Sequence, residues 1–205
     1  MGKLIVLDGL DGSGKGTQCK LLEEFLQKKE KNFKKINLPD YESPSSALVK
    51  MYLSAAFYAV DRFANYTTSW KELYQNQYLI LADRYTTSNV VHQMVKLPRQ
   101  QWDEYIRWLY DFEFTKMRLP KPDLVIYLDM HPDISQKLLS SRYNGDETKK
   151  DIHEKDLAYL RLCREAALYG AQALDWQVVR CFEENNPLSK EEITKKILQL
   201  VDKLV

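Results

Sequence analysis

Short aliphatic runs alternate along the chain with longer stretches in which apolar residues recur every three or four positions. Aliphatic and β-branched runs of this length, bounded by turn residues, are typical of strands buried in a parallel sheet. The predicted strands lie at residues 4–7, 33–38, 78–83, 124–129 and 177–182. Because helical stretches separate them, the pattern predicts an α/β fold: a three-layer sandwich with a five-stranded parallel sheet and helices on both faces.

The helical stretches also carry start signals. Ser43 followed by Pro44, and later Ser189, predict helix N-termini, because serine caps a helix and proline suits its first turn. The first predicted helix ends near residues 28–31. The later predicted helices cover residues 44–53, 57–66, 88–95, 101–114, 132–142, 155–174 and 189–204.

The segment at residues 142–155 is almost wholly polar and has no apolar periodicity. This composition predicts a mobile surface segment, which in an enzyme would serve as a lid. No composition shift, repeat or linker divides the chain, so we expect a single domain over residues 1–205.

A glycine-rich stretch, GLDGSGKGT at residues 9–17, follows the first predicted strand and precedes a helix. Glycines allow a tight turn whose N–H groups point inward, and the helix N-terminus adds partial positive charge, so the stretch predicts a phosphate-binding loop. The alternative is a plain tight turn. The residues expected to bind the phosphates of a donor such as ATP are Gly9, Gly12, Ser13, Gly14, Lys15, Gly16 and Thr17.

Charged residues at the ends of the predicted strands complete a candidate site. Thr17 with a carboxylate, Asp83 or Asp11, is expected to hold Mg²⁺ directly or through water. Arg62 and Arg84 are expected to bind the phosphate of an acceptor, although pairing with neighbouring aspartates would also explain them. An acceptor phosphate arrives ionised and needs no general base. The three histidines, which form no nucleophile-and-base pattern, fit that expectation.

The overall charge is close to balanced, with 30 basic and 29 acidic residues and a formal net charge of +1. No polybasic stripe favours nucleic acid or a membrane surface, so small-molecule partners are expected. Three cysteines without a C-x-x-C pair argue against a disulfide framework or a zinc site. No run approaches the roughly 20 apolar residues of a membrane span, and the chain begins without a secretory signal pattern, so a cytoplasmic location is expected.

Five motifs together resemble the thymidylate kinase family of nucleoside monophosphate kinases. They are GLDGSGKGTQ at 9–18, PDYESP at 39–44, YAVDRF at 58–63, DRYTTSN at 83–89 and PDLVIYLD at 122–129. The resemblance runs over nearly the whole chain. It implies a P-loop kinase fold, ATP with Mg²⁺ as donor, dTMP as acceptor, dTDP and ADP as products, and a homodimer.

The resemblance also implies roles for individual residues. Tyr58 matches the aromatic position that stacks on thymine, while Ser88 and Asn89 match positions that read the base edge. The implied dTMP-binding residues are Asp11, Tyr41, Tyr58, Arg62, Arg84, Ser88, Asn89 and His92. The implied catalytic residues are Lys15, Arg84, Asp11, Arg142, Lys149 and Lys150.

The chain departs from the family pattern at four places. Gly12 stands where some members have an arginine, so the lid cations Arg142, Lys149 and Lys150 are the candidates for the charge that stabilises the transition state. His92 replaces a tyrosine that excludes a ribose 2′-hydroxyl, and Gly16 displaces the P-loop hydroxyl to Thr17. The segment at residues 53–57 is shorter than in the family.

Other functions remain open from the sequence alone. Another nucleoside monophosphate kinase would share the P-loop but not the acceptor motifs. A deoxynucleoside kinase would use Asp83 or Asp11 as a base, and a regulatory module would bind nucleotide without turnover.

Overall fold

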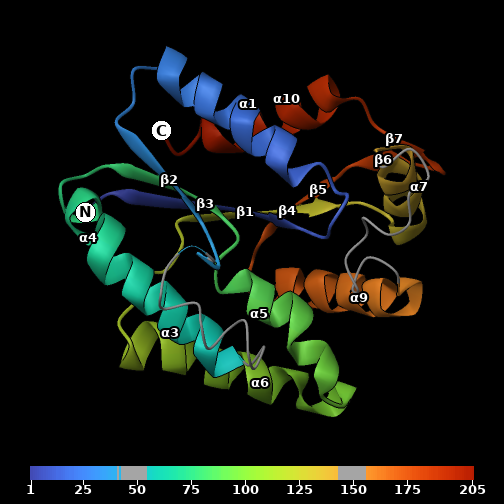
Figure 1. Cartoon of the computed structure of the whole chain (residues 1–205), viewed down its shortest axis with the longest axis horizontal. Coiled ribbons are helices and arrows are strands. Elements are labelled where there is room, and N and C mark those ends of the chain that lie inside the picture. Colours follow the sequence, from blue (N-terminus) through green and yellow to red (C-terminus); the bar gives the residue numbers. More distant parts are fainter. Residues whose placement is uncertain (41, 43–54, 143–155) are drawn as a thin grey trace.

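A central sheet of five parallel strands organises the computed structural model, in the order β2-β3-β1-β4-β5 (Figure 1). The strands are β1 (Lys3–Gly9), β2 (Phe33–Asn37), β3 (Leu79–Asp83), β4 (Leu124–Asp129) and β5 (Gln177–Arg180). The structure describes residues 1–40, 42, 55–142 and 156–205, without the side chains of 140–142. The predicted helix at 44–53 and nearly all of the predicted lid therefore lie outside the described residues.

Strand β1 lies in the middle of the sheet and is buried on both faces. Residues 4–7 have no exposed surface, as expected for a strand written as a continuous aliphatic run. In parallel register, Leu7 lies beside Asp83 of β3, and Gly9 lies beside Leu128 of β4. The carboxyl ends of β1, β3 and β4 therefore share one edge of the sheet, where parallel α/β sheets place their ligands.

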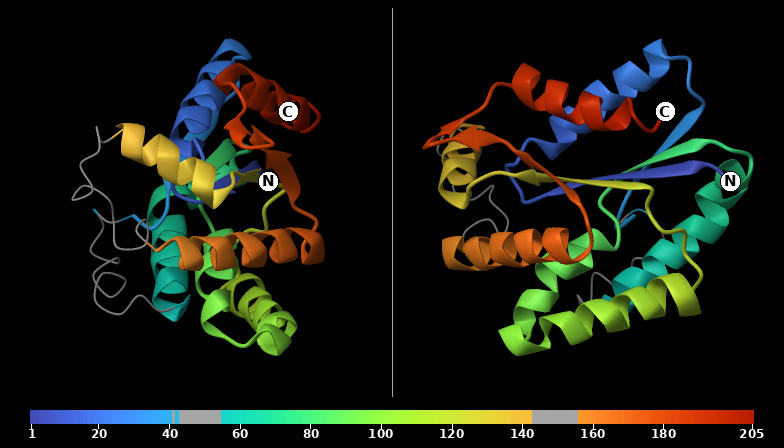
Figure 2. Two further views of the ribbon diagram at one scale, coloured as in Figure 1. Left: turned by 90° about the vertical axis from the view of Figure 1, so that its right-hand side faces the viewer. Right: turned by 180° about the vertical axis from the view of Figure 1, so that it is seen from behind.

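Helices cover both faces of the sheet, so the three-layer prediction is confirmed (Figures 1 and 2). Helices α1 (Lys15–Lys28) and α10 (Lys190–Val201) cover one face. The other face carries α3 (Ala55–Asn65), α4 (Lys71–Gln75), α5 (Thr87–His92), α6 (Trp102–Tyr110) and α9 (Leu157–Ala173). Helix α7 (Pro132–Arg142) and a small hairpin of β6 (Phe182–Glu183) and β7 (Asn186–Pro187) lie near the carboxyl edge.

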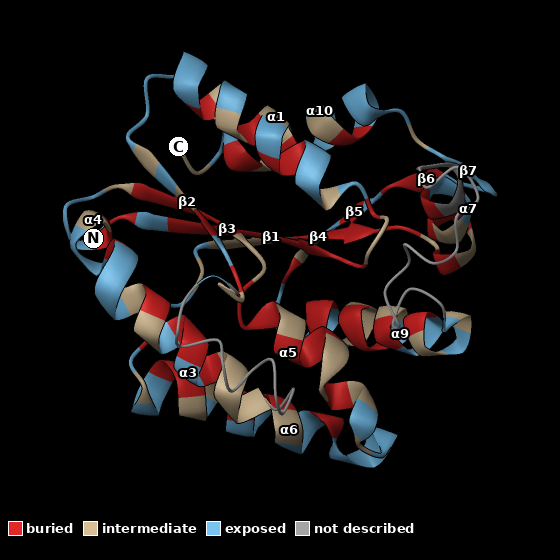
Figure 3. Ribbon diagram, viewed as in Figure 1, coloured by how far each residue is buried: buried red, intermediate tan, exposed pale blue. Residues whose placement is uncertain are grey.

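Buried residues line both interfaces between helices and sheet (Figure 3). Leu22 and Leu26 of α1 pack with Ile197 of α10 and the strands on one side. Val90 of α5, Leu109 of α6 and Ala167 of α9 pack on the other. The cysteines Cys19, Cys163 and Cys181 are free and buried, and burial raises the pKa of each thiol to about 12.

Most predicted elements begin and end within a few residues of the observed ones, but three differ. The helix predicted at 57–66 continues through a π-helical turn, η2 (Tyr66–Trp70), into α4, because Trp70 and Tyr74 extend its buried face. The helix predicted at 101–114 ends in a second π-helical segment, η5 (Asp111–Lys116). The strand predicted at 177–182 is divided between β5 and β6, whose hairpin the sequence pattern did not indicate.

Two short 3₁₀ turns, η3 (Met94–Lys96) and η4 (Arg99–Gln101), join α5 to α6. The Ser189 cap is confirmed as a capping box, since its side chain accepts a hydrogen bond from Glu192 N while the Glu192 carboxylate accepts one from Ser189 N. Among the described helices, none has the length and apolar composition of a membrane span.

Candidate active site

The loop between β1 and α1 is built to hold anions. Gly12 and Gly14 have φ angles of +77° and +86°, which glycine adopts without strain. Gly14 caps α1, whose first turn has no acidic residue and no side-chain cap. The first N–H groups of this helix therefore keep their donors and their partial positive charge for a ligand. They face a hollow of about 600 Å³ lined by the loop, Lys20 and Leu139 of α7.

Two buried oxygen atoms, Ser13 Oγ in this loop and Asp83 Oδ1 at the end of β3, make no hydrogen bond with any residue that the structure describes. Lys15 Nζ lies 2.8 Å from Asp83 Oδ1, an ion pair that is largely buried. The pair is not aligned as a hydrogen bond, and within the described part of the chain neither Asp83 Oδ1 nor the buried Ser13 Oγ has a hydrogen-bond partner. Buried polar atoms are normally satisfied, so both atoms fit a site completed by a ligand such as a phosphate or a hydrated cation.

A second cavity, of about 420 Å³, lies between the strand ends and helices α3, α5 and α9. Asp11 and Lys15 line both this cavity and the loop hollow, so the two spaces meet at these side chains. Nine of the predicted residues line the second cavity: Asp11, Lys15, Tyr58, Arg62, Asp83, Arg84, Ser88, Asn89 and His92. Tyr41, Lys149, Lys150 and the side chain of Arg142 lie outside the described residues.

Arg84 lies at the end of the cavity nearest the loop. It follows β3 with a left-handed φ of +69°. Its guanidinium donates to Asp11 Oδ1 at 2.8 Å and to Ser88 Oγ at 3.4 Å, and it lies 3.2 Å from His92 Nε2. Because arginine can only donate, His92 Nε2 is the acceptor, which leaves the ring proton on Nδ1, 3.6 Å from Cys163 Sγ. Asp11 and His92 thus hold the guanidinium from two sides.

Asp8 ties α5 to the P-loop, although the sequence did not single it out. Its buried carboxylate accepts hydrogen bonds from Gly9 N at 2.8 Å, from Ser88 Oγ at 2.8 Å and from Thr87 Oγ1. Its position as an acid within an aliphatic strand was the available signal. These bonds fix the start of α5, and with it Ser88, against the end of β1.

Arg62 lies at the other end of the cavity and is paired with Glu113, which sequence reasoning missed. Arg62 Nε donates to Glu113 Oε2 at 2.8 Å, and the Nη2 group contacts Oε1. Glu113 has no exposed surface. It comes from η5, where it extends the buried helical stripe of Trp102, Ile106 and Leu109. An acid on an apolar helical stripe was the signal for this residue. The alternative that Arg62 serves Asp61 is not what the structure shows.

Aromatic and apolar side chains form the walls. Tyr58 lies one turn before Arg62 on α3, and both line the cavity, as their spacing predicted. Tyr159 of α9, not predicted, lines it as well, and its ring is stacked on that of His92 with centroids 6.4 Å apart. Burial is the main cause that raises the pKa of Tyr159, so this phenol stays neutral. The walls therefore suit a flat ring.

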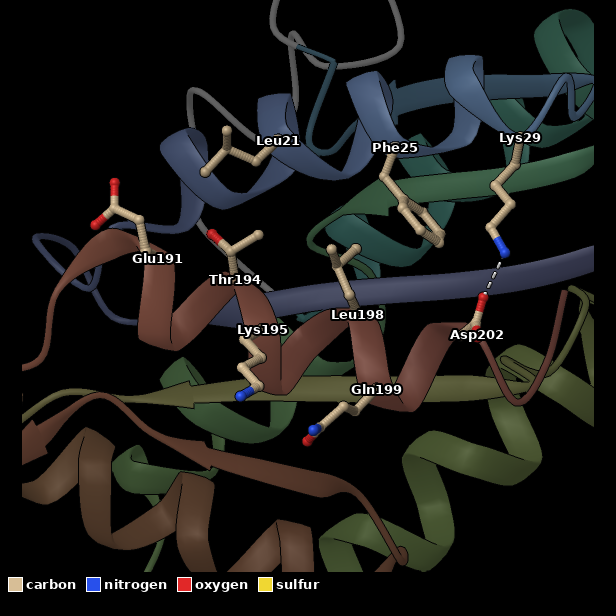
Figure 4. Close-up of a pocket in the computed structure, with 9 residues that line it drawn as sticks. All are labelled: Leu21, Phe25, Lys29, Glu191, Thr194, Lys195, Leu198, Gln199 and Asp202. Carbon is tan, nitrogen blue, oxygen red and sulfur yellow. Dashed lines mark hydrogen bonds and ion pairs between the residues drawn. The ribbon is translucent and has the colours of Figure 1, made fainter.

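A different hollow lies between α1 and α10, on the opposite face of the sheet (Figure 4). Leu21, Phe25 and Leu198 form its apolar part. At its rim Lys29 and Asp202 pair with each other at 2.9 Å and are about half exposed. Nothing in this hollow brings buried polar groups together, so it lacks the features of a reaction site.

A glycine-rich loop after the central parallel strand, joined through Lys15 to a second cavity with its own arginine, defines a P-loop nucleotide-binding protein of the α/β class. Residues 7–197 match the sequence model of the family described as thymidylate kinase. The chain belongs to the thymidylate kinase family.

Individual proteins similar to this chain carry the name of the same family. A protein named "Probable thymidylate kinase" from Staphylothermus marinus is 33% identical over 175 residues, covering 82% of this chain and 81% of the relative. "Probable thymidylate kinase 1" from Saccharolobus solfataricus is 28% identical, covering 84% and 89%. The solved structure of thymidylate kinase from Candida albicans superposes with a TM-score of 0.70 at 20% identity, covering 98% and 92%, which confirms the fold.

Proposed function

We propose that this protein transfers the γ-phosphoryl group of ATP to the phosphate of dTMP, producing dTDP and ADP. The observation that carries the proposal is the meeting of two anion-ready cavities at Lys15 and Asp11. Phosphoryl transfer depends mainly on holding donor and acceptor in line and neutralising charge, and such an arrangement does both.

The loop hollow is the donor side. The N–H groups at the start of α1 and the ammonium of Lys15 bind the phosphates of ATP. Thr17 and Asp83 would hold Mg²⁺ together with phosphate oxygens and water, since magnesium prefers few protein ligands and Asp83 Oδ1, although paired with Lys15, accepts no hydrogen bond. When bound, the cation neutralises charge on the transferred group. Lys15 and Asp83 keep each other in position at 2.8 Å.

The Arg84 end of the second cavity receives the acceptor phosphate. Its guanidinium, supported by Asp11 and His92, keeps N–H groups within reach of the cavity. The acceptor oxygen is already ionised and needs no base, and both nearby aspartates are engaged by cations. Ser88 also serves this end rather than the base edge, because its hydroxyl donates to Asp8 and accepts from Arg84.

The Arg62 end receives the base. The Glu113 carboxylate compensates the charge of Arg62, which makes the guanidinium better suited to a neutral carbonyl oxygen than to a phosphate dianion. We therefore assign Arg62, together with Asn89, to the base edge, and keep the phosphate for Arg84. Tyr58 stacks on the base, and His92 lies where it limits the sugar.

The remaining assignments complete the proposal. Gly12 offers no cation, so the transition-state charge is assigned to Arg142, Lys149 and Lys150. We assign Val60, Phe63 and Trp108, on the adjacent helices α3 and α6, to a homodimer interface. These large apolar residues are 42, 39 and 46% exposed, respectively. Sedimentation of the purified protein tests the dimer. Nucleic acid and membranes are not expected as partners, and a cytoplasmic location is expected.

The test is ADP formation from ATP with a panel of acceptors. We expect dTMP to be best, dUMP to be about 10 to 200-fold poorer for want of one methyl group, and dCMP to be poorer still. Lys15→Met is expected to lower kcat by at least about 10², whereas Lys28→Met, on the exposed end of α1, leaves it unchanged.

Other outcomes contradict the proposal in different ways. Turnover of thymidine in place of dTMP indicates a nucleoside kinase. Failure to form ADP with any of the monophosphates indicates a regulatory module that binds nucleotide without turnover. In the same assay, an unchanged kcat after joint replacement of Lys149 and Lys150 by alanine removes them from the transition state.

A further inference from the structure

The Glu113 carboxylate accepts hydrogen bonds from three residues at the base end of the cavity. It accepts from Arg62 through Nε and Nη2, from Thr86 Oγ1 at 2.6 Å, and from Asn89 Nδ2 at 3.3 Å. With these four contacts and no exposed surface, both of its oxygens are fully engaged within the protein. Glu113 therefore does not bind substrate itself but holds the groups that line the cavity.

The orientation of the Asn89 amide follows from these neighbours. Its Nδ2 group lies 3.3 Å from Glu113 Oε1 and 3.2 Å from the carbonyl oxygen of Ala55, and both of these atoms only accept hydrogen bonds. The amide nitrogen must face them, because an oxygen there would meet two acceptors. Asn89 lines the cavity, so its Oδ1 is the atom left to accept a hydrogen bond from a ligand.

Arg62 supplies the opposite polarity. Glu113 takes Nε and one N–H of Nη2, while Nη1 lies 3.5 Å from the carbonyl oxygen of Tyr85, a weak contact. A guanidinium has five N–H groups and no acceptor, so it presents N–H donors to the cavity that it lines. The base end thus offers a donor from Arg62 beside an acceptor from Asn89.

We propose that Glu113 is a positioning residue that fixes this donor and acceptor order and so selects a 4-keto, 3-imino pyrimidine over a 4-amino one. Thymine and uracil present a carbonyl at C4 and an N–H at N3, which complement Arg62 and Asn89. Cytosine presents an amino group and an unprotonated nitrogen, which oppose both. The inference rests on the proposed function, because it concerns the base of the same acceptor.

The experiment compares dTMP with 5-methyl-dCMP, which keeps the methyl group and inverts only the hydrogen-bonding edge. The wild-type protein is expected to prefer dTMP in kcat/KM by at least about 10², because a site built to hydrogen-bond rejects a mismatched edge strongly. In Glu113→Gln the preference is expected to fall at least about tenfold, since the new amide can donate to Asn89 Oδ1 and allow its amide to turn.

Two further variants make the result decisive. Glu113→Asp keeps a negative charge beside Arg62 but shortens the side chain, so its preference is also expected to fall, and it decides the outcome if Glu113→Gln does not fold. Glu104→Gln, on the exposed side of α6, is the matched control and keeps the wild-type preference.

The possible failures are distinguishable. Equal loss of activity on both nucleotides in folded Glu113 variants, with the preference unchanged, would show a merely structural role and overturn the inference. Equal kcat/KM for the two nucleotides in the wild type would overturn it as well. Absence of dTMP turnover by the wild type would instead reject the proposed function, and this inference with it.

Discussion

The two arginines of the second cavity occupy opposite environments. Arg84 pairs with an Asp11 side chain that is 38% exposed, and Arg84 itself is 18% exposed. Arg62 pairs with a Glu113 side chain that has no exposure at all, and it is 4% exposed. Both pairs join an arginine to a carboxylate at short distance and both arginines line the cavity, yet the Arg84 pair is partly exposed to solvent while the Arg62 pair is buried.

The difference shows how one residue type serves two purposes. A partly exposed pair such as Arg84–Asp11 contributes less to stability than a buried one. A buried pair is strongly destabilising to break, so Arg62 stays where Glu113 holds it and works as part of a rigid surface. The loop end of the cavity is therefore suited to bind charge, and the Glu113 end to read shape and hydrogen bonds.

The largest expected effect separates the two arginines by activity. Arg84→Met is expected to lower kcat/KM for dTMP by about 10³, because a charged partner of the phosphate is removed. Its free energy of unfolding should change by less than about 1 kcal/mol. Steady-state kinetics and urea unfolding measure the two quantities. Inhibition by thymidine, which has no phosphate, should be nearly unaffected, and an equal loss of thymidine binding would contradict the separation.

Arg62→Met should show the opposite balance in stability. Its free energy of unfolding is expected to fall by about 3–5 kcal/mol, since the Glu113 carboxylate is left buried without its partner. Urea unfolding measures this change. Adding Glu113→Gln to Arg62→Met removes the buried charge and should recover part of the loss. If Arg62→Met is no more destabilising than Arg84→Met, the contrast between the two ends does not hold.

The smallest effect concerns Cys163, which lies behind His92 at the Arg84 end. Burial raises the pKa of its thiol from 9.0 to about 12, so Cys163→Ala should leave the shape of the kcat profile between pH 6 and 9 unchanged. The folded state holds this proton more tightly than the unfolded state does. Its contribution to stability is therefore complete below pH 9 and is lost as the pH rises toward 12.

Unfolding by urea at pH 8 and pH 10, under reducing conditions, measures that loss. Cys163→Ala should lose about 1 kcal/mol less than the wild type over this interval. A change in the kcat profile below pH 9 would instead show that the thiolate takes part in the chemistry of this end.

Much of the loop end was predictable because its signals are local. Lys15 stands in a glycine-rich loop after an aliphatic strand, and Arg84 follows another strand directly. Parallel strands bring their carboxyl ends to one edge, so sequence position alone predicts that such residues meet. The alternation of strands and helices along the chain could be predicted without knowledge of distant contacts.

The Glu113 end was less predictable because its contacts are distant in sequence. Glu113 meets Arg62 across 51 residues and Thr86 across 27. Its place on the apolar helical stripe indicates burial, but not which cation lies opposite it. The sequence predicted a phosphate role for Arg62 and a base-edge role for Ser88 without knowledge of the Arg62–Glu113 pair and the Ser88–Asp8 bond, and the different roles proposed above for both residues rest on these contacts.

The left-handed backbone at Arg84 has a consequence for how this protein can evolve. A non-glycine residue with φ of +69° is strained by about 1–2 kcal/mol. Selection for thermal resistance alone would favour glycine at this position. Arg84→Gly is therefore expected to relieve this strain while removing the guanidinium that the proposed function assigns to the acceptor phosphate, so thermostability and turnover would change in opposite directions at a single residue.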